Sequence, residues 1–307
     1  MASNRYRSCF YDPTYGKITA IFRSGRGNAK SQTKRGGFLK NTMKSVAAIL
    51  GSAFQDSMPR ALNLQRIEIR TAWGTQALYQ AQNFRRPAYI LFRHGLPHRL
   101  LPHQIDYRSQ AQALAQVDCG ALLVTSSVGV MDPDLPLFEP MLLSDLIMLD
   151  NRLPDGSTCT MFTEPSSTQG HLVVTEGLFS EELNRQIRRL AHDLIHTAKQ
   201  PIVFAYVAGP RTKTPAENRV WHKLGVQVNS MTLAPEVVLA NELKIPCTGL
   251  VVGHKYSTPD IKNMADPKSM SDSLESSKDA METLILRYLE NGKPVSFGNR
   301  IYRFNHG

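Results

Sequence analysis

The stretch that decides the fold is YILFRHGLPHRLLPHQIDY, residues 89–107. It opens with an apolar run, Tyr89 to Phe92, of the kind that predicts a short buried strand. Arg93 and His94 follow at once, and His98 comes four residues later. A buried strand that opens into cations and imidazoles is either the start of an ordinary surface loop or one wall of a site for an anion.

Two further apolar runs end in small and hydroxyl residues. SVAAILGS (45–52) closes on Ser52, and ALLVTSSVG (121–129) closes on Ser126 and Ser127. Ligands of open α/β sheets bind beyond the carboxyl ends of the strands. Together with the Arg-His pair, these strand ends offer a guanidinium, an imidazole, hydroxyls and backbone N–H groups, which is the donor set that surrounds a phosphate.

The rest of the chain alternates between strand and helix patterns, which predicts an α/β fold with a mixed sheet flanked by helices. A capping box is expected at Thr214, with Pro215 at the first helical position and Glu217 at the third, and Ser180 is expected to cap another helix. The predicted further strands are 66–73, 145–150, 201–209 and 247–254, and the predicted helices are 109–118, 180–199, 214–225, 234–244 and 271–292.

The net charge of +10 belongs to the N-terminus. Residues 1–44 hold ten Lys and Arg and one acid, so they carry +9, while the other 26 basic and 25 acidic residues leave +1. We therefore divide the chain into a flexible basic arm, 1–44, and one domain, 45–307. Such an arm either attracts nucleic acid through its phosphates or remains a solvated tail, and we favour the tail.

Several classes of protein are not supported by the sequence. It contains no GxxxxGK[ST] loop, no GxGxxG after a strand and no GxSxG elbow. The four cysteines show no metal-ligand or disulfide spacing, so no metal is expected. No apolar run reaches the ~18–20 residues of a membrane helix and no hydrophobic signal core follows Met1, so we expect a cytoplasmic protein that does not contact a membrane.

With these motifs in hand, the chain resembles the purine nucleoside phosphorylase family, and its methylthioadenosine phosphorylase branch most of all. The resemblance covers about residues 46–290 and rests on ILGS, RHGLPHRLLPHQIDY, LLVTSSVG, AGP, AEN and LGVQVNSMTLAPEVVLANEL. It implies a twisted mixed sheet with a partial barrel, a homotrimer, and reversible phosphorolysis of a purine or purine-like nucleoside, with or without a 5′ modification. Inorganic phosphate would be the co-substrate, and no cofactor is implied.

The resemblance also implies roles for individual residues. The phosphate would be bound by Ser52, Arg93, His94, Ser126, Ser127 and Thr232. Met231, Tyr107 and His98 would lie on the ribose side, and His171, Ser271 and Leu274 would belong to the 5′ pocket, with His171 reaching that of a neighbouring subunit.

The base pocket departs from the family pattern. Ser230 and four positions that differ from the family fall there: Thr212, Lys213, Lys255 and Ser257. A protonated lysine can only donate hydrogen bonds, so the two lysines favour carbonyl oxygens, an anionic base or a carboxylate, if they face the ligand. The alternative is that one or both point to solvent.

Three functions are compatible with these features. The first is the phosphorolysis described above, which we favour because the predicted phosphate site is complete. The second is hydrolysis of the same bond, which would not need Arg93 and the hydroxyl groups. The third is a non-catalytic protein that binds a nucleoside or base.

Overall fold

The computed structural model describes residues 9–12, 17–20, 43–54, 59, 62–258 and 267–303, but not the side chains of 9–12, 17–20 and 267–276. Most of the predicted arm, 1–44, therefore lies outside the described residues. Within it, β1 (Cys9–Asp12) and β2 (Lys17–Ala20) pair as an antiparallel two-stranded sheet.

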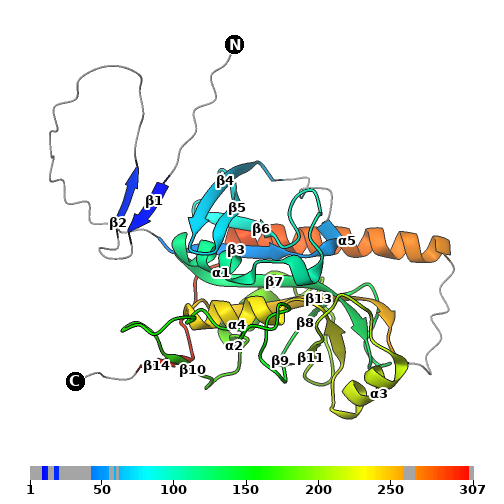
Figure 1. The fold of residues 1–307 in the computed structure, drawn as a ribbon. Coiled ribbons are helices and arrows are strands. Elements are labelled where there is room, and N and C mark those ends of the chain that lie inside the picture. The colour runs from blue at the N-terminus through cyan, green and yellow to red at the C-terminus, as the bar shows by residue number, and fades with distance from the viewer. Residues whose placement is uncertain are drawn as a thin grey trace, which may run out of the picture.

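A mixed sheet forms the centre of the domain, as the sequence predicted (Figure 1). Its strands follow the order β4-β5-β6-β3-β7-β12-β11-β9, and β13 and β8 join it through β7. The bounds are β3 (Ser45–Leu50), β4 (Leu64–Thr71), β5 (Gly74–Ala81), β6 (Ala88–Phe92), β7 (Cys119–Val130), β8 (Pro140–Leu142), β9 (Asp145–Ile147), β11 (Val203–Tyr206), β12 (Val228–Ser230) and β13 (Cys247–Tyr256).

The long strand β7 divides the sheet. Its first half pairs with β3 and its last residues pair with β12, both along one edge, while β13 runs parallel to it along the other edge. Because β3, β6, β7 and β13 are mutually parallel, the carboxyl ends of β3, β6 and β13 come together beside the second half of β7. Every strand end that the sequence singled out therefore meets in one place.

Helices cover both faces of this sheet (Figure 1). All six residues of β3 are buried, which explains its continuous apolar sequence, since a parallel strand covered on both faces shows no alternation. On one face α2 (Glu181–Leu190) and α5 (Pro267–Asn291) contribute Leu183, Ile187, Ile285 and Leu289 to the core. On the other face lie α1 (Tyr107–Gln116) and α4 (Ala234–Glu242).

The remaining elements are short. They are α3 (Pro215–Lys223), the 3₁₀ helices η1 (Ser52–Phe54) and η2 (Pro102–Gln104), and a two-stranded sheet of β10 (His171–Val173) and β14 (Arg300–Tyr302). The capping box at Thr214 and the cap at Ser180 are confirmed: Thr214 accepts from the N–H of Glu217, and Ser180 accepts from the N–H of Leu183.

Several boundaries differ from the sequence prediction; the strand predicted over 201–209, for example, spans only Val203–Tyr206. The helix predicted over 180–199 ends at Leu190, because Ala191 leaves the helical conformation and packs fully buried against α5 and the sheet. Leu194 and Ile195 still reach this core through a turn whose N–H groups bond to the Ala191 carbonyl. The strand predicted over 145–150 ends at Ile147.

Candidate active site

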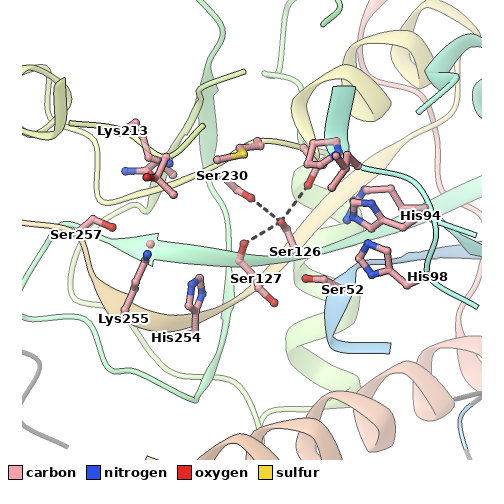
Figure 2. Close-up of a pocket in the computed structure, with 18 of the residues that line it drawn as sticks. Ser52, His94, His98, Ser126, Ser127, Lys213, Ser230, His254, Lys255 and Ser257 are labelled. Carbon is pink, nitrogen blue, oxygen red and sulfur yellow. Dashed lines mark hydrogen bonds between the residues drawn. The ribbon is translucent and has the colours of Figure 1, made fainter. Parts of the chain in front are cut away.

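A cavity of about 340 Å³ lies where the strand ends meet. Figure 2 shows its two ends: Ser52, His94 and His98 at one, and Lys213, Lys255 and Ser257 at the other. It gathers thirteen of the residues predicted from sequence: Ser52, Arg93, His94, His98, Ser126, Ser127, Thr212, Lys213, Ser230, Met231, Thr232, Lys255 and Ser257.

Three hydroxyl groups converge in the middle of the cavity. The Oγ of Ser126 lies 3.2 Å from the Oγ of Ser230 and 3.4 Å from the Oγ1 of Thr232, as the dashed lines of Figure 2 mark. Since each hydroxyl carries one rotatable proton and two lone pairs, the cluster can turn donors toward a bound anion. Ser230 ends β12 and Ser126 lies within β7, so the cluster exists only because these strands are neighbours.

The neighbouring Thr125 has a structural task. Its hydroxyl accepts from the N–H of Gly51 at 3.1 Å and donates to the carbonyl of Ile49 at 3.0 Å. These bonds fix the turn after β3 that carries Ser52 to the cavity. Gly51 also leaves room for Arg93, whose Nη1 would lie 2.8 Å from a Cβ at that position.

Arg93 forms a buried ion pair with Glu236, a residue that the sequence analysis did not single out. Its Nε donates to the carboxylate of Glu236 on α4, and both side chains are about 1 % exposed. Its Nη2 and the second oxygen of Glu236 have no hydrogen-bond partner. The guanidinium is thus anchored to α4 by Nε, and Arg93 also lines the cavity.

His94 is neutral at pH 7. Burial, followed by the charge of Arg93, lowers its pKa to about 4. Its Nδ1 lies 2.8 Å from the carbonyl oxygen of Leu100, which can only accept, so the proton resides on Nδ1 and Nε2 is an acceptor. His98 stacks on its ring, with a centroid separation of 4.3 Å.

Lys213 and Lys255 both line the opposite end of the cavity. Burial, and then the charge of Lys255, lowers the pKa of Lys213 to about 8. Burial and both lysines also lower the pKa of His254, which the same cavity contains. The departures from the family pattern therefore lie together at one end of the cavity, where Lys213 is half-buried and Lys255 is exposed.

Two asparagines and a glycine complete this end and were missed from sequence. Asn229, on β12, is 1 % exposed, and neither its Nδ2 nor its Oδ1 has a partner. The Oδ1 of Asn218 is likewise buried without a partner. Gly129 permits the close approach of Ser257, whose Oγ would lie 2.2 Å from a Cβ at Gly129. An asparagine within a short strand gives no sequence signal for such a role.

A second cavity, of about 440 Å³, adjoins the first and shares Ser52, Ser127 and His254 with it. Its far wall is α5, through Ser277 and Met281. This places α5 at the side where the sequence predicted a 5′ pocket, although Ser271 and Leu274 themselves lie outside the described side chains.

Two predicted site residues lie elsewhere. Tyr107 begins α1, is 1 % exposed and donates to the carbonyl of Pro102 at 3.0 Å, so its ribose-side role is corrected to a structural one. His171 is exposed on β10 and stacks on Tyr302. It lines no cavity described above, and its predicted contact with a neighbouring subunit stays a prediction.

The described residues contain no group of three or more His, Cys, Asp or Glu side chains placed to hold one metal ion. No helix in the described part of the chain is long and apolar enough to cross a membrane.

Comparison with known proteins agrees with this arrangement. A model of the phosphorylase superfamily matches residues 58–290, which include all the strand ends from β6 to β13. The chain belongs to the phosphorylase superfamily. The match confirms the resemblance inferred from the motifs, and Ser52 lies just before the matched range.

Individual relatives cover most of the chain. A probable S-methyl-5′-thioinosine phosphorylase of Methanopyrus kandleri is 35% identical over 206 residues, covering 66% of this chain and 75% of its own. A probable 6-oxopurine nucleoside phosphorylase of Thermococcus kodakarensis is 27% identical over 255 residues, covering 81% and 92%.

Solved structures share the fold. The methylthioadenosine phosphorylase of Schistosoma mansoni in complex with tubercidin superposes with a TM-score of 0.68 at 20% identity, covering 80% of this chain and 90% of that one. A methylthioadenosine phosphorylase from an Antarctic soil metagenomic library gives a TM-score of 0.69, covering 80% and 85%. The fold is thus the phosphorylase α/β fold.

Proposed function

We propose that this phosphorylase superfamily member cleaves the N-glycosidic bond of a purine nucleoside with inorganic phosphate, giving the free base and a ribose 1-phosphate. The observation that carries the proposal is the grouping of Arg93, His94 and the Ser126–Ser230–Thr232 hydroxyl cluster in one cavity of about 340 Å³. The names of the relatives support the same reaction class.

The chemistry assigns a task to each end. As the C1′–N bond breaks, its electron pair goes to the base and positive charge develops on the sugar. A phosphate oxygen held beside C1′ stabilises that charge and then forms the new C1′–O bond, while the base leaves as an anion and takes up a proton from solvent. Preorganised donors at both ends contribute most in such a reaction, because they need no reorganisation in the transition state.

At the phosphate end, the guanidinium of Arg93 and the hydroxyl cluster supply donors. The neutral His94 offers Nε2 as an acceptor, which suits a phosphate oxygen that carries a proton. At the other end, Lys213 and Lys255 donate to the leaving base as it becomes negative. No step requires a group beyond the chain, the nucleoside, phosphate and solvent.

The second cavity extends the proposal to the 5′ position. It adjoins Ser52 and Ser127 and offers about 440 Å³. A nucleoside with a substituent on its 5′ carbon therefore fits the space beside the phosphate end. A homotrimeric assembly and a cytoplasmic location, which the resemblance implies, complete the proposal and are tested by light scattering and by cell fractionation.

The test is release of base from a panel of nucleosides with and without phosphate. We expect release that requires phosphate or arsenate. Release at the same rate in phosphate-free buffer would identify a hydrolase. Binding of phosphate and base without turnover of any nucleoside would identify a non-catalytic binder.

A further inference from the structure

The positive charge of the cavity is concentrated at the base end. At the phosphate end, Arg93 is neutralised by Glu236, and His94 is neutral. At the base end, the described residues record no ion pair between a carboxylate and either Lys213 or Lys255.

The nearest acid that acts on these lysines is already engaged. The charge of Glu217 partly opposes the lowering of the pKa of Lys213. The Glu217 carboxylate, however, already accepts two hydrogen bonds from Arg211, at 2.7 and 2.9 Å, and one from the N–H of Thr214 at 2.7 Å. The negative charge of Glu217 is therefore largely compensated by Arg211 and by the N–H group of Thr214. The two lysines remain a like-charged pair: burial first, and then the charge of Lys255, lowers the pKa of Lys213.

A buried amide faces the same space. Asn229 lines the cavity at 1 % exposure with both polar atoms unpartnered, and a buried polar group of this kind is costly unless a ligand satisfies it. The base end thus offers two cationic donors and the amides of Asn218 and Asn229, each of which has both a donor and an acceptor. It holds more donors than acceptors.

This donor set discriminates between purines. Adenine presents an exocyclic amine, a donor that would meet an ammonium group and stay unpaired, which costs binding energy. A purine with one carbonyl oxygen can accept a hydrogen bond from only one of the two lysines. A purine with carbonyl oxygens at C2 and C6 satisfies both, and it loses a proton more readily, so it also supplies the missing negative charge.

We propose, on the basis of the function given above, that Lys213 and Lys255 make the enzyme selective for nucleosides of 2,6-dioxopurines, the xanthine type. The two ammonium groups bind the two carbonyl oxygens and stabilise the negative base as the C1′–N bond breaks. Asn229 pairs with a ring nitrogen edge through its free amide.

The experiment compares kcat/KM for xanthosine, inosine and adenosine, with phosphate, in the wild type and in Lys213→Met and Lys255→Met. The matched control is Lys223→Met, because Lys223 is exposed on α3 and does not line the cavity. We expect the wild type to favour xanthosine over inosine at least about tenfold, since a bond to a charged group is lost with inosine. Each cavity variant should shrink this ratio about tenfold, and the control should keep it.

Calorimetric binding of free xanthine, hypoxanthine and adenine in the presence of phosphate gives a readout that does not require turnover. The same order of affinity is expected, and Lys255→Arg should retain part of the preference for xanthine that Lys255→Met loses.

The outcomes separate the two proposals. A xanthosine-to-inosine ratio near one in the wild type, or a ratio that both Met variants leave unchanged, overturns the dioxopurine selectivity while phosphorolysis stands. Absence of turnover with every nucleoside overturns the proposed reaction, and the affinities for the free bases then still decide the selectivity.

Discussion

Arg93 and Glu236 form an ion pair beneath the cavity, with each side chain about 1 % exposed. Arg93 directly follows β6, and Glu236 lies in the first turn of α4. The pair therefore connects the sheet to a helix, and its two residues are 143 positions apart in the chain. Its geometry decides what Arg93 can do: Nε is bound to Glu236, while Nη2 is left without a partner. The ion pair therefore both orients the guanidinium of Arg93 and compensates its positive charge.

Glu236→Gln should destabilise the protein and weaken phosphate binding together. Removing one partner of a buried pair leaves the other charge uncompensated, which costs roughly 3–5 kcal/mol. Urea unfolding measures the stability, and the KM for phosphate reports the orientation of Arg93. The control is Glu68→Gln, which breaks an ion pair with Arg66 in which both side chains are more than half exposed. Unfolding curves that are equal for the two variants would contradict the structural role of the buried pair.

Thr232→Val and Ser126→Ala should each raise the KM for phosphate. Both remove a hydroxyl from the cluster in which Ser126 lies 3.4 Å from Thr232, and a hydrogen bond to a charged group contributes about 1.5–3 kcal/mol, or roughly tenfold or more in KM. Steady-state kinetics with phosphate and nucleoside varied separately makes the measurement. Ser166→Ala, on an exposed loop, is the control. A rise in the nucleoside KM alone would move the phosphate away from this cluster.

Acidification should destabilise the protein through His94. The pKa of His94 is lowered from 6.5 to about 4 in the fold, so between these values the unfolded chain binds more protons and the free energy of unfolding rises with pH. As the pH falls from about 6.5 to 4, on the order of 3 kcal/mol should be lost. Urea unfolding at several pH values, with His94→Asn showing a flatter dependence, tests this. His222→Asn, on an exposed position of α3, should retain the wild-type slope.

Activity should fall on the alkaline side as Lys213 loses its proton. Its pKa of about 8 keeps the ammonium charged below that pH and neutral above it, so kcat/KM for inosine should decline above about pH 8. Lys213→Arg keeps a cation at high pH and should move the decline upward. An alkaline limb at the same pH in both proteins would assign the titration to another group.

Gly129→Ala should impair the base end through Ser257. The new Cβ would lie 2.2 Å from the Oγ of Ser257 and 3.4 Å from the Oδ1 of Asn229, so Ser257 must turn away. We expect kcat/KM to fall by about tenfold while the thermal unfolding temperature changes little, because the clash involves the end of one side chain. The double variant Gly129→Ala, Ser257→Ala should resemble Ser257→Ala alone, as expected for residues in contact. Additive losses would show that the two positions act independently.

Much of the phosphate end was predictable from sequence because its residues follow apolar strands directly. A strand's end fixes where the next side chain lies, so Ser52 and Arg93 could be placed from the runs that precede them. Tyr107 was placed on the ribose side by the family resemblance alone. It lies beyond an irregular segment, and its hydroxyl donates to the carbonyl of Pro102. Glu236 escaped notice because helix α4 is buried nearly all round, so its first turn carries no pattern that marks one side.

The base end required the tertiary structure. Lys213 lies in the segment after β11, Lys255 lies in β13 and Asn229 in β12. The local sequence does not say how the segment after β11 packs beside the ends of β12 and β13, so it does not show that these side chains line one cavity.

By itself the sequence determined the alternation of strands and helices, the family, and the donors at the phosphate end, because each rests on local patterns of burial and on strand ends. The tertiary structure decided which charges are cancelled and which are not. Arg93 is paired with Glu236, while Lys213 lies close enough to Lys255 for its charge to lower the pKa of Lys213, and both arrangements follow from packing between segments far apart in the chain.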